Sequence, residues 1–155
     1  MNINLAINKG SKILKSKFIP NPQLDAEILM AKTINKDRNY ILLNSNEIVS
    51  RNDLNNFNKL IEQRALGNPV AYLTNKKFFW NSEFFITNDV LIPRPDTELV
   101  IENVLNLTKQ KSKLNILDIG VGSGCILLSI LNERKNFYGT GIDTVSYTHL
   151  RAHET

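Results

Sequence analysis

The sequence predicts an α/β protein that begins with an all-helical bundle, continues through a β-hairpin and ends in the opening unit of a parallel sheet. Apolar residues recur at helical spacing up to about residue 66, and from Phe78 they follow the period of strands. After residue 114 a strand, a glycine turn, an apolar helix and a second strand succeed one another, which is the order of a parallel β-α-β unit.

The first 66 residues predict helices. The first helix has apolar residues near helical spacing, and Gly10 and Ser11 are expected to weaken its middle. Pro22 stands at a first-turn position of the second helix, a short apolar stretch covers residues 40–43, and Gly67 is a natural stop for a helix over residues 52–66. The expected buried positions are Ile3, Ile7, Ile13, Leu14 and Phe18, then Leu24, Ile28 and Ala31, then Leu54, Phe57, Leu60, Ile61 and Ala65.

The middle of the chain predicts strands. Residues 78–80 and 84–87 are aromatic and β-branched runs on either side of residues 81–83, the pattern of a hairpin, and residues 90–92 suggest a third short strand. Trp80 either packs the hairpin on a neighbour or forms a stacking platform, and packing is favoured. Two prolines within residues 93–98 redirect the chain into a helix whose expected face is Leu99, Val100, Asn103, Val104 and Leu107.

The strongest chemical signal is the glycine turn between two expected strands, residues 114–119 and 137–142. A glycine turn lets a ligand approach the bare backbone, and the helix over residues 125–131 offers free N–H groups. Asp143 closes the second strand, where a carboxylate can accept both hydroxyls of a ribose. These features predict a site for a nucleoside-containing cofactor, formed by Gly120, Val121, Gly122, Ser123, Gly124 and Asp143.

Two nucleoside-containing cofactors, a nicotinamide dinucleotide and S-adenosylmethionine, could bind at such a turn. The dinucleotide fingerprint requires a glycine where this chain has Cys125, whereas Asp-x-Gly-x-Gly-x-Gly is the pattern of Rossmann-like methyltransferases that bind S-adenosylmethionine. A third interpretation is that the glycines only form a tight turn and bind no ligand. Asp143 makes this interpretation less favoured. Cys125 itself is interpreted as a small apolar helix residue and not as a nucleophile.

Composition restricts the class of protein. The 155 residues carry a net charge of +4 without a dense basic block, so Lys9, Lys12, Lys15 and Lys17 are interpreted as a solvated helix face, and no direct nucleic-acid binding is expected. A single cysteine excludes an internal disulfide, and no apolar run is long enough for a membrane span. We therefore expect a cytoplasmic protein without a membrane or metal site.

The end of the chain, residues 144–155, is expected to be a non-native tail. Residues 145–155 match an in-frame translation of a transposase-type sequencing adaptor, and they contain both histidines, His149 and His153. These two alone cannot complete a zinc site. On this interpretation the chain is truncated after the second strand of its parallel unit.

Residues 91–98, Leu-Ile-Pro-Arg-Pro-Asp-Thr-Glu, lie upstream of the glycine turn and resemble the hallmark of the release-factor glutamine N5-methyltransferases. The stretch Arg-Ala-Leu-Gly-Asn-Pro-Val-Ala-Tyr-Leu at residues 64–73 and the pair Phe79–Trp80 are similar to that family's linker region. The resemblance covers residues 1–143. A sister group that methylates a ribosomal protein carries Pro-Arg-Ser-Pro at residues 93–96, so it is the less favoured alternative.

The resemblance implies a helical substrate-recognition domain over residues 1–75, a hairpin linker over 76–95 and a partial Rossmann-like class I methyltransferase domain over 96–143. It implies S-adenosylmethionine on residues 120–124 with the ribose on Asp143, a loop braced by Asp118, and a pocket lined by residues 94–98, where Arg94 and Glu98 are equally well a structural pair. The implied reaction methylates the Gly-Gly-Gln glutamine of peptide chain release factors.

The family's catalytic Asn-Pro-Pro-Tyr loop is absent from this sequence. We therefore expect no catalytic residues and no activity in this chain as it stands. Two interpretations from other classes remain open: a nicotinamide-dependent oxidoreductase, and a non-catalytic module that docks a translation factor through residues 1–75.

Overall fold

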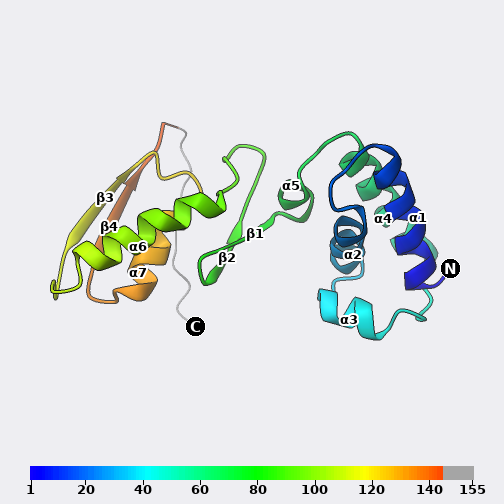
Figure 1. Cartoon of the computed structure of the whole chain (residues 1–155), viewed down its shortest axis with the longest axis horizontal. Coiled ribbons are helices and arrows are strands. Elements are labelled where there is room, and N and C mark those ends of the chain that lie inside the picture. Colours follow the sequence, from blue (N-terminus) through cyan, green and yellow to red (C-terminus); the bar gives the residue numbers. More distant parts are fainter. Residues whose placement is uncertain (145–155) are drawn as a thin grey trace. The chain divides into compact units, whose positions relative to one another are not determined.

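The computed structural model describes residues 1–144, which form two compact units, one from Met1 to Thr74 and one from Asn75 onward (Figure 1). The expectations for the tail and its two histidines fall on residues 145–155, outside the described part of the chain. Among the described helices, none is both long and apolar enough to cross a membrane.

The first unit consists of the helices α1 (Ile3–Ser16), α2 (Pro22–Thr33), α3 (Arg38–Leu43), α4 (Arg51–Ala65) and α5 (Val70–Thr74). Side-chain caps set three of the helix starts, because the side chains of Asn2, Asp37 and Ser50 accept the main-chain N–H three residues ahead. The predicted helical bundle is therefore confirmed.

α2 is the central helix of this unit, since α1, α3, α4 and α5 all pack against it. It is consequently buried on more than one side. Of the predicted stripe Ala31 is buried, but Leu24 is exposed, and the buried residues Ala26, Leu29 and Met30 lie outside the stripe. Phe18 is also exposed, because α1 ends before it at Ser16.

Gly10 lies where α1 and α4 approach each other closely. A Cβ on Gly10 would lie 2.9 Å from Phe57 Cζ and 2.9 Å from Ile61 Cδ1, two buried side chains of α4. The expected weakness is therefore compensated by close packing between the two helices.

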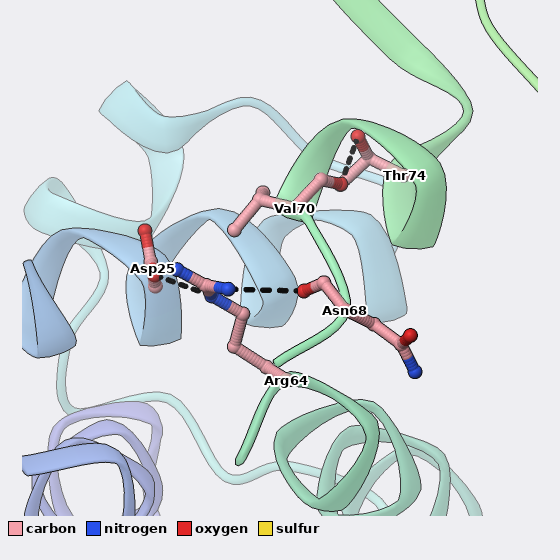
Figure 2. A network of polar contacts seen from close by, with 5 residues as sticks. All are labelled: Asp25, Arg64, Asn68, Val70 and Thr74. Atoms are coloured by element: carbon pink, nitrogen blue, oxygen red, sulfur yellow. Dashed lines mark hydrogen bonds and ion pairs between the residues drawn. The ribbon is translucent and has the colours of Figure 1, made fainter. Parts of the chain in front are cut away.

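Two buried carboxylates on α2 bind arginines of neighbouring helices. Glu27 pairs with Arg38 of α3 at 2.7 Å, and Asp25 pairs with Nε of Arg64 of α4 at 2.7 Å. Figure 2 shows that Arg64 also turns toward Asn68, where Nη1 donates to the main-chain oxygen at 3.1 Å. These contacts tie α3, α4 and the connection that precedes α5 to the central helix.

The second unit opens with a hairpin of β1 (Lys76–Phe79) and β2 (Ser82–Phe85). Its turn contains only Trp80 and Asn81, so the strands begin and end about two residues earlier than predicted. Trp80 has a φ of 53°, and a positive φ at the first turn residue is a requirement of the primed hairpin turns. The main-chain N–H of Trp80 donates to Glu98 and its indole N–H donates to Glu133, which joins the turn to two helices.

The prediction of a third strand at residues 90–92 is wrong. β1 and β2 pair only with each other, and Pro93 lacks the N–H that a further ladder would need. A 3₁₀ turn at Pro95–Thr97 leads into α6 (Glu98–Leu107), whose buried residue is Ile101, while Leu99, Val100 and Leu107 are exposed. The expected apolar face of α6 is therefore also wrong, because Ile101 marks the side that is covered.

The end of the described chain is the predicted parallel unit. β3 (Asn115–Ile119) and β4 (Tyr138–Ile142) pair in parallel, from Asn115 opposite Tyr138 to Ile119 opposite Ile142, and α7 (Cys125–Glu133) connects them. Leu127 of α7 covers Gly139, where a Cβ would lie 2.7 Å from Leu127 Cδ1. Helices, hairpin and β-α-β unit together confirm the predicted α/β fold class, as the start of a Rossmann-like domain.

Candidate functional site

The loop between β3 and α7 has a backbone that strongly favours glycine. Gly120 and Gly122 have φ values of 82° and 52°, in the left-handed region that side chains with a Cβ rarely adopt. A Cβ on Gly120 would meet nothing within 4 Å, so the surface beside that residue is open backbone. The N–H groups of Gly120 and Val121 both donate to Ile142 O of β4, at 2.7 and 3.1 Å.

Asp143 follows β4 directly and lies against this loop. Its Oδ2 accepts the main-chain N–H of Gly122 at 2.7 Å, and its Oδ1 accepts the N–H of Thr144 at 2.7 Å. Two parts of the sequence 21 residues apart are thereby brought to one place. The hydroxyl of Thr144 also donates to Oδ1, at 3.4 Å, so both carboxylate oxygens act as acceptors in the structure.

Asp118, near the end of β3, adds a second carboxylate. Burial, and then the charge of Asp143, raise the pKa of Asp118 above its usual value. Its Oδ2 is buried and has no hydrogen-bond partner among residues 1–144. Such a group is stabilised when a donor or a cation reaches it. The unpaired Oδ2 can accept a hydrogen bond from a donor that approaches this end of β3. The expected bracing of the loop by Asp118 stays a prediction.

Cys125, the first residue of α7, is buried, and its burial is the main reason why the pKa of its thiol is raised. A raised pKa keeps the sulfur protonated at neutral pH, and the protonated form is the poorer nucleophile. The structure therefore agrees with an apolar role in the helix.

The segment of residues 90–98 approaches the glycine loop at Val90. Val90 Cγ1 would lie 3.7 Å from a Cβ on Gly122, so Val90 borders the loop. Glu98 Oε1 accepts the N–H of Trp80 at 2.8 Å and so fixes the hairpin turn, while Arg94 is exposed. Val90 and Glu133 carried no signal in the sequence, because only the fold brings them to the loop and to the hairpin.

We expect Asp118→Asn to stabilise the chain at pH 7. A raised pKa means that folded Asp118 binds its proton more tightly than unfolded Asp118 does, so stability falls as pH rises from the ordinary pKa of 3.8 through the raised one. The amide removes this cost. Thermal unfolding should show a higher Tm for the variant at pH 7, with the difference shrinking as the pH approaches 3.8. A lower Tm at pH 7 would contradict the interpretation.

Residues 6–74 match the family described as PrmC N-terminal domain. The chain is 39% identical over 132 residues to a release factor glutamine methyltransferase of Leptospira interrogans, covering 84% of this chain and 46% of that protein. A protein of the same name from Buchnera aphidicola is 36% identical over 137 residues, covering 88% and 50%. A bifunctional methyltransferase of Rickettsia typhi is 35% identical over 153 residues, covering 87% and 30%. The chain thus spans about half the length of the first two relatives.

Proposed function

Because this chain belongs to the release factor glutamine methyltransferase family, we propose that its glycine loop binds S-adenosylmethionine. We further propose that a protein of the relatives' full length transfers the methyl group to the side-chain nitrogen of the glutamine in the Gly-Gly-Gln motif of a peptide chain release factor. The helical unit, which contains the matched residues 6–74, would recognise that protein substrate.

The observation that carries the cofactor proposal is the hydrogen bond between Asp143 Oδ2 and the N–H of Gly122. It holds a carboxylate at the end of β4 beside the bare backbone between β3 and α7. In open parallel sheets, nucleoside ligands bind outside the carboxyl ends of the strands, and an acid there accepts the ribose hydroxyls. Asp143 would bind the ribose hydroxyls. Residues 120–124 would enclose the methionine and ribose portion of the cofactor.

The charge of the site favours S-adenosylmethionine over a dinucleotide. Asp118 and Asp143 are close enough for the charge of one to raise the pKa of the other. Two carboxylates attract the sulfonium and ammonium groups of S-adenosylmethionine and repel a pyrophosphate. Cys125 also stands where the dinucleotide fingerprint places a glycine for close packing of helix and strand.

The reaction places clear demands on a full-length enzyme. S-adenosylmethionine supplies an electrophilic methyl group, and the amide nitrogen that receives it is a weak nucleophile because its lone pair is delocalised. Positioning and hydrogen bonding of the amide must therefore provide most of the catalysis. The Asn-Pro-Pro-Tyr sequence proposed for this role is absent from the 155 residues, so this chain contributes binding and orientation of the cofactor.

Calorimetric titration of the chain tests the cofactor assignment. We expect S-adenosylmethionine to bind more tightly than NAD, because the site is anionic and Cys125 replaces the third glycine of the fingerprint. S-adenosylhomocysteine lacks the sulfonium charge and is the control ligand for that charge. It should bind more weakly than S-adenosylmethionine. Tighter binding of NAD would refute the assignment.

A methyl-transfer assay with radiolabelled S-adenosylmethionine and a release factor tests the division of roles. We expect no transfer by this chain and transfer by a complete relative such as the Leptospira interrogans protein. If this chain turns over at a comparable rate, the groups that position the amide lie within its own residues, and the proposed role of the Asn-Pro-Pro-Tyr loop is wrong.

A further inference from the structure

The helix α1 ends in a hydrogen-bonded motif that usually has glycine at its turning point. The N–H of Phe18 donates to Lys15 O at 3.0 Å, and the N–H of Ile19 donates to Leu14 O at 3.2 Å. These two bonds form a Schellman motif, in which the residue after the C-cap adopts a left-handed backbone. Here that residue is Phe18, with a φ of 58°. A residue with a Cβ is strained in this conformation.

The ring of Phe18 is not part of the core. It is 94% exposed, more than any other large apolar side chain among residues 1–144, while Ile19 beside it packs on the core of the helical unit. The other residues with a Cβ and a positive φ are two asparagines, which tolerate this region, and Trp80, whose indole N–H donates to Glu133. Phe18 therefore combines backbone strain with an exposed ring, and residues strained in this way cluster at functional sites.

Lysines surround this end of α1, the dark blue helix of Figure 1. Lys12, Lys15 and Lys17 are exposed, and no acidic residue precedes Asp25 in the chain. The ion pairs among residues 1–144 involve none of these three lysines. Lys12 and Lys15 are three positions apart and are therefore neighbours on the surface of the helix. The positive charge beside Phe18 is consequently not neutralised by the folded chain.

The acidic residues of the helical unit are engaged elsewhere. Five of the six bind arginines, hydroxyl groups or a main-chain N–H away from α1: Asp25 with Arg64, Glu27 with Arg38, Asp37 with the N–H of Tyr40, Glu47 with the hydroxyl of Tyr40, and Asp53 with the hydroxyl of Ser50. The whole net charge of +4 lies in residues 1–74. A surface with such an excess attracts an acidic partner and speeds their encounter.

We propose that Phe18, Lys12, Lys15 and Lys17 form a docking surface, the Phe18 surface, for an acidic face of the release factor. The proposal rests on the proposed function, which assigns the release factor as substrate. The partner's face is apolar where it receives the ring and carries Asp or Glu side chains around that point. An aromatic anchor with charged groups at its rim is the arrangement that provides most of the binding energy in protein interfaces.

A protein face fits the Phe18 surface better than a nucleic acid does. Proteins bind single-stranded nucleic acid with successive aromatic rings along a basic groove, so that several bases stack. Phe18 is the one exposed phenylalanine of the helical unit. No arginine, the residue best suited to phosphate contacts, lies within residues 1–37. One ring beside three lysines therefore favours a single apolar pocket with an acidic rim.

Phe18→Gly separates a docking role from a structural one. Glycine relieves the strained backbone and removes the ring. We expect this variant of the whole chain to have a higher Tm than the parent in thermal unfolding. We also expect its affinity for a purified release factor, measured by surface plasmon resonance, to be at least about tenfold weaker, as for the loss of an interface hot spot. A residue that only stabilised the fold would give a lower Tm.

Leu43→Ala is the matched control for the loss of an exposed apolar side chain. Leu43 is 84% exposed in the same unit and lies near the opposite end of α1, because Ser45 O accepts the N–H of Asn4. The 14 residues of α1 place that end about 20 Å from Phe18. Leu43→Ala should keep the parental affinity for the release factor.

Charge reversal tests the lysines. Lys15→Glu should weaken binding of the release factor and make the affinity less sensitive to the NaCl concentration, because salt screens the attraction that this lysine provides. Lys59→Glu makes the same change of net charge at an exposed lysine of α4. It is the matched control and should retain more of the parental affinity than Lys15→Glu does.

The outcomes separate the Phe18 surface from the proposed substrate. A higher Tm with weaker binding in Phe18→Gly supports the surface, whereas a lower Tm overturns it, because the ring would then pack within the chain. Parental affinity in Phe18→Gly or Lys15→Glu, or equal losses in the controls, overturns the surface and leaves the release factor as substrate. If the parent chain does not bind the release factor, both proposals fail. Binding of a single-stranded RNA that Phe18→Gly abolishes would assign the surface to nucleic acid and overturn the protein partner.

Discussion

Replacing Asp143 with Ala is expected to weaken S-adenosylmethionine binding by about tenfold or more. Each charge-assisted hydrogen bond from a ribose hydroxyl to a carboxylate contributes about 1.5–3 kcal/mol, and about 1.4 kcal/mol corresponds to a factor of ten in affinity. The variant also loses the bond from the Gly122 N–H, so the loop itself becomes less ordered. Both effects lower affinity, and calorimetric titration measures their sum.

Asp143→Asn separates the two effects. Its amide oxygen can still accept the Gly122 N–H, but the negative charge is gone. If ribose binding by the carboxylate dominates, the affinity of Asp143→Asn falls nearly as far as that of Asp143→Ala; if loop order dominates, it stays close to that of the parent. Glu102→Ala removes an exposed acid from α6 and is the control for net charge. Parental affinity in Asp143→Ala would show that the ribose binds elsewhere.

The sequence could predict the parts of the fold that depend on local pattern. The glycine turn, the acid after the second strand and the two-residue periodicity of the hairpin each have a local physical cause, and the structure places these elements in the predicted order. Asp143 reaches Gly122 because consecutive parallel strands bring their carboxyl ends together.

The features that the sequence could not predict depend on what surrounds an element. The stripe Leu24, Ile28 and Ala31 is regular, but α2 has neighbours on several sides, so regularity does not identify its buried face. Aspartate is a residue type that usually lies on the surface, so the sequence does not mark Asp25 as buried. Only the fold shows that Arg64, 39 positions later, pairs with it. Val90 beside Gly122 is a contact of the same kind.

Arg64→Leu is expected to destabilise the helical unit by about 3–5 kcal/mol, the cost of leaving a buried charge without its partner. Asp25 is 8% exposed, and in this variant its carboxylate loses the guanidinium at 2.7 Å. The Asn68 carbonyl, in the connection between α4 and α5, loses its donor as well. Domains of this size are stable by about 5–15 kcal/mol, so the change removes a large share of the total. Urea unfolding followed by far-ultraviolet circular dichroism measures it.

The double variant Asp25→Leu with Arg64→Leu distinguishes an unpaired charge from a simple loss of contact. Replacing both members of a buried pair with apolar residues is often neutral or stabilising, so the double variant should be more stable than Arg64→Leu alone. Lys76→Ala is the control, because its pair with Glu83 also measures 2.7 Å but both side chains are at least half exposed. That change should cost no more than about 1 kcal/mol. Equal losses in Arg64→Leu and Lys76→Ala would mean that burial of the Asp25–Arg64 pair has no energetic consequence.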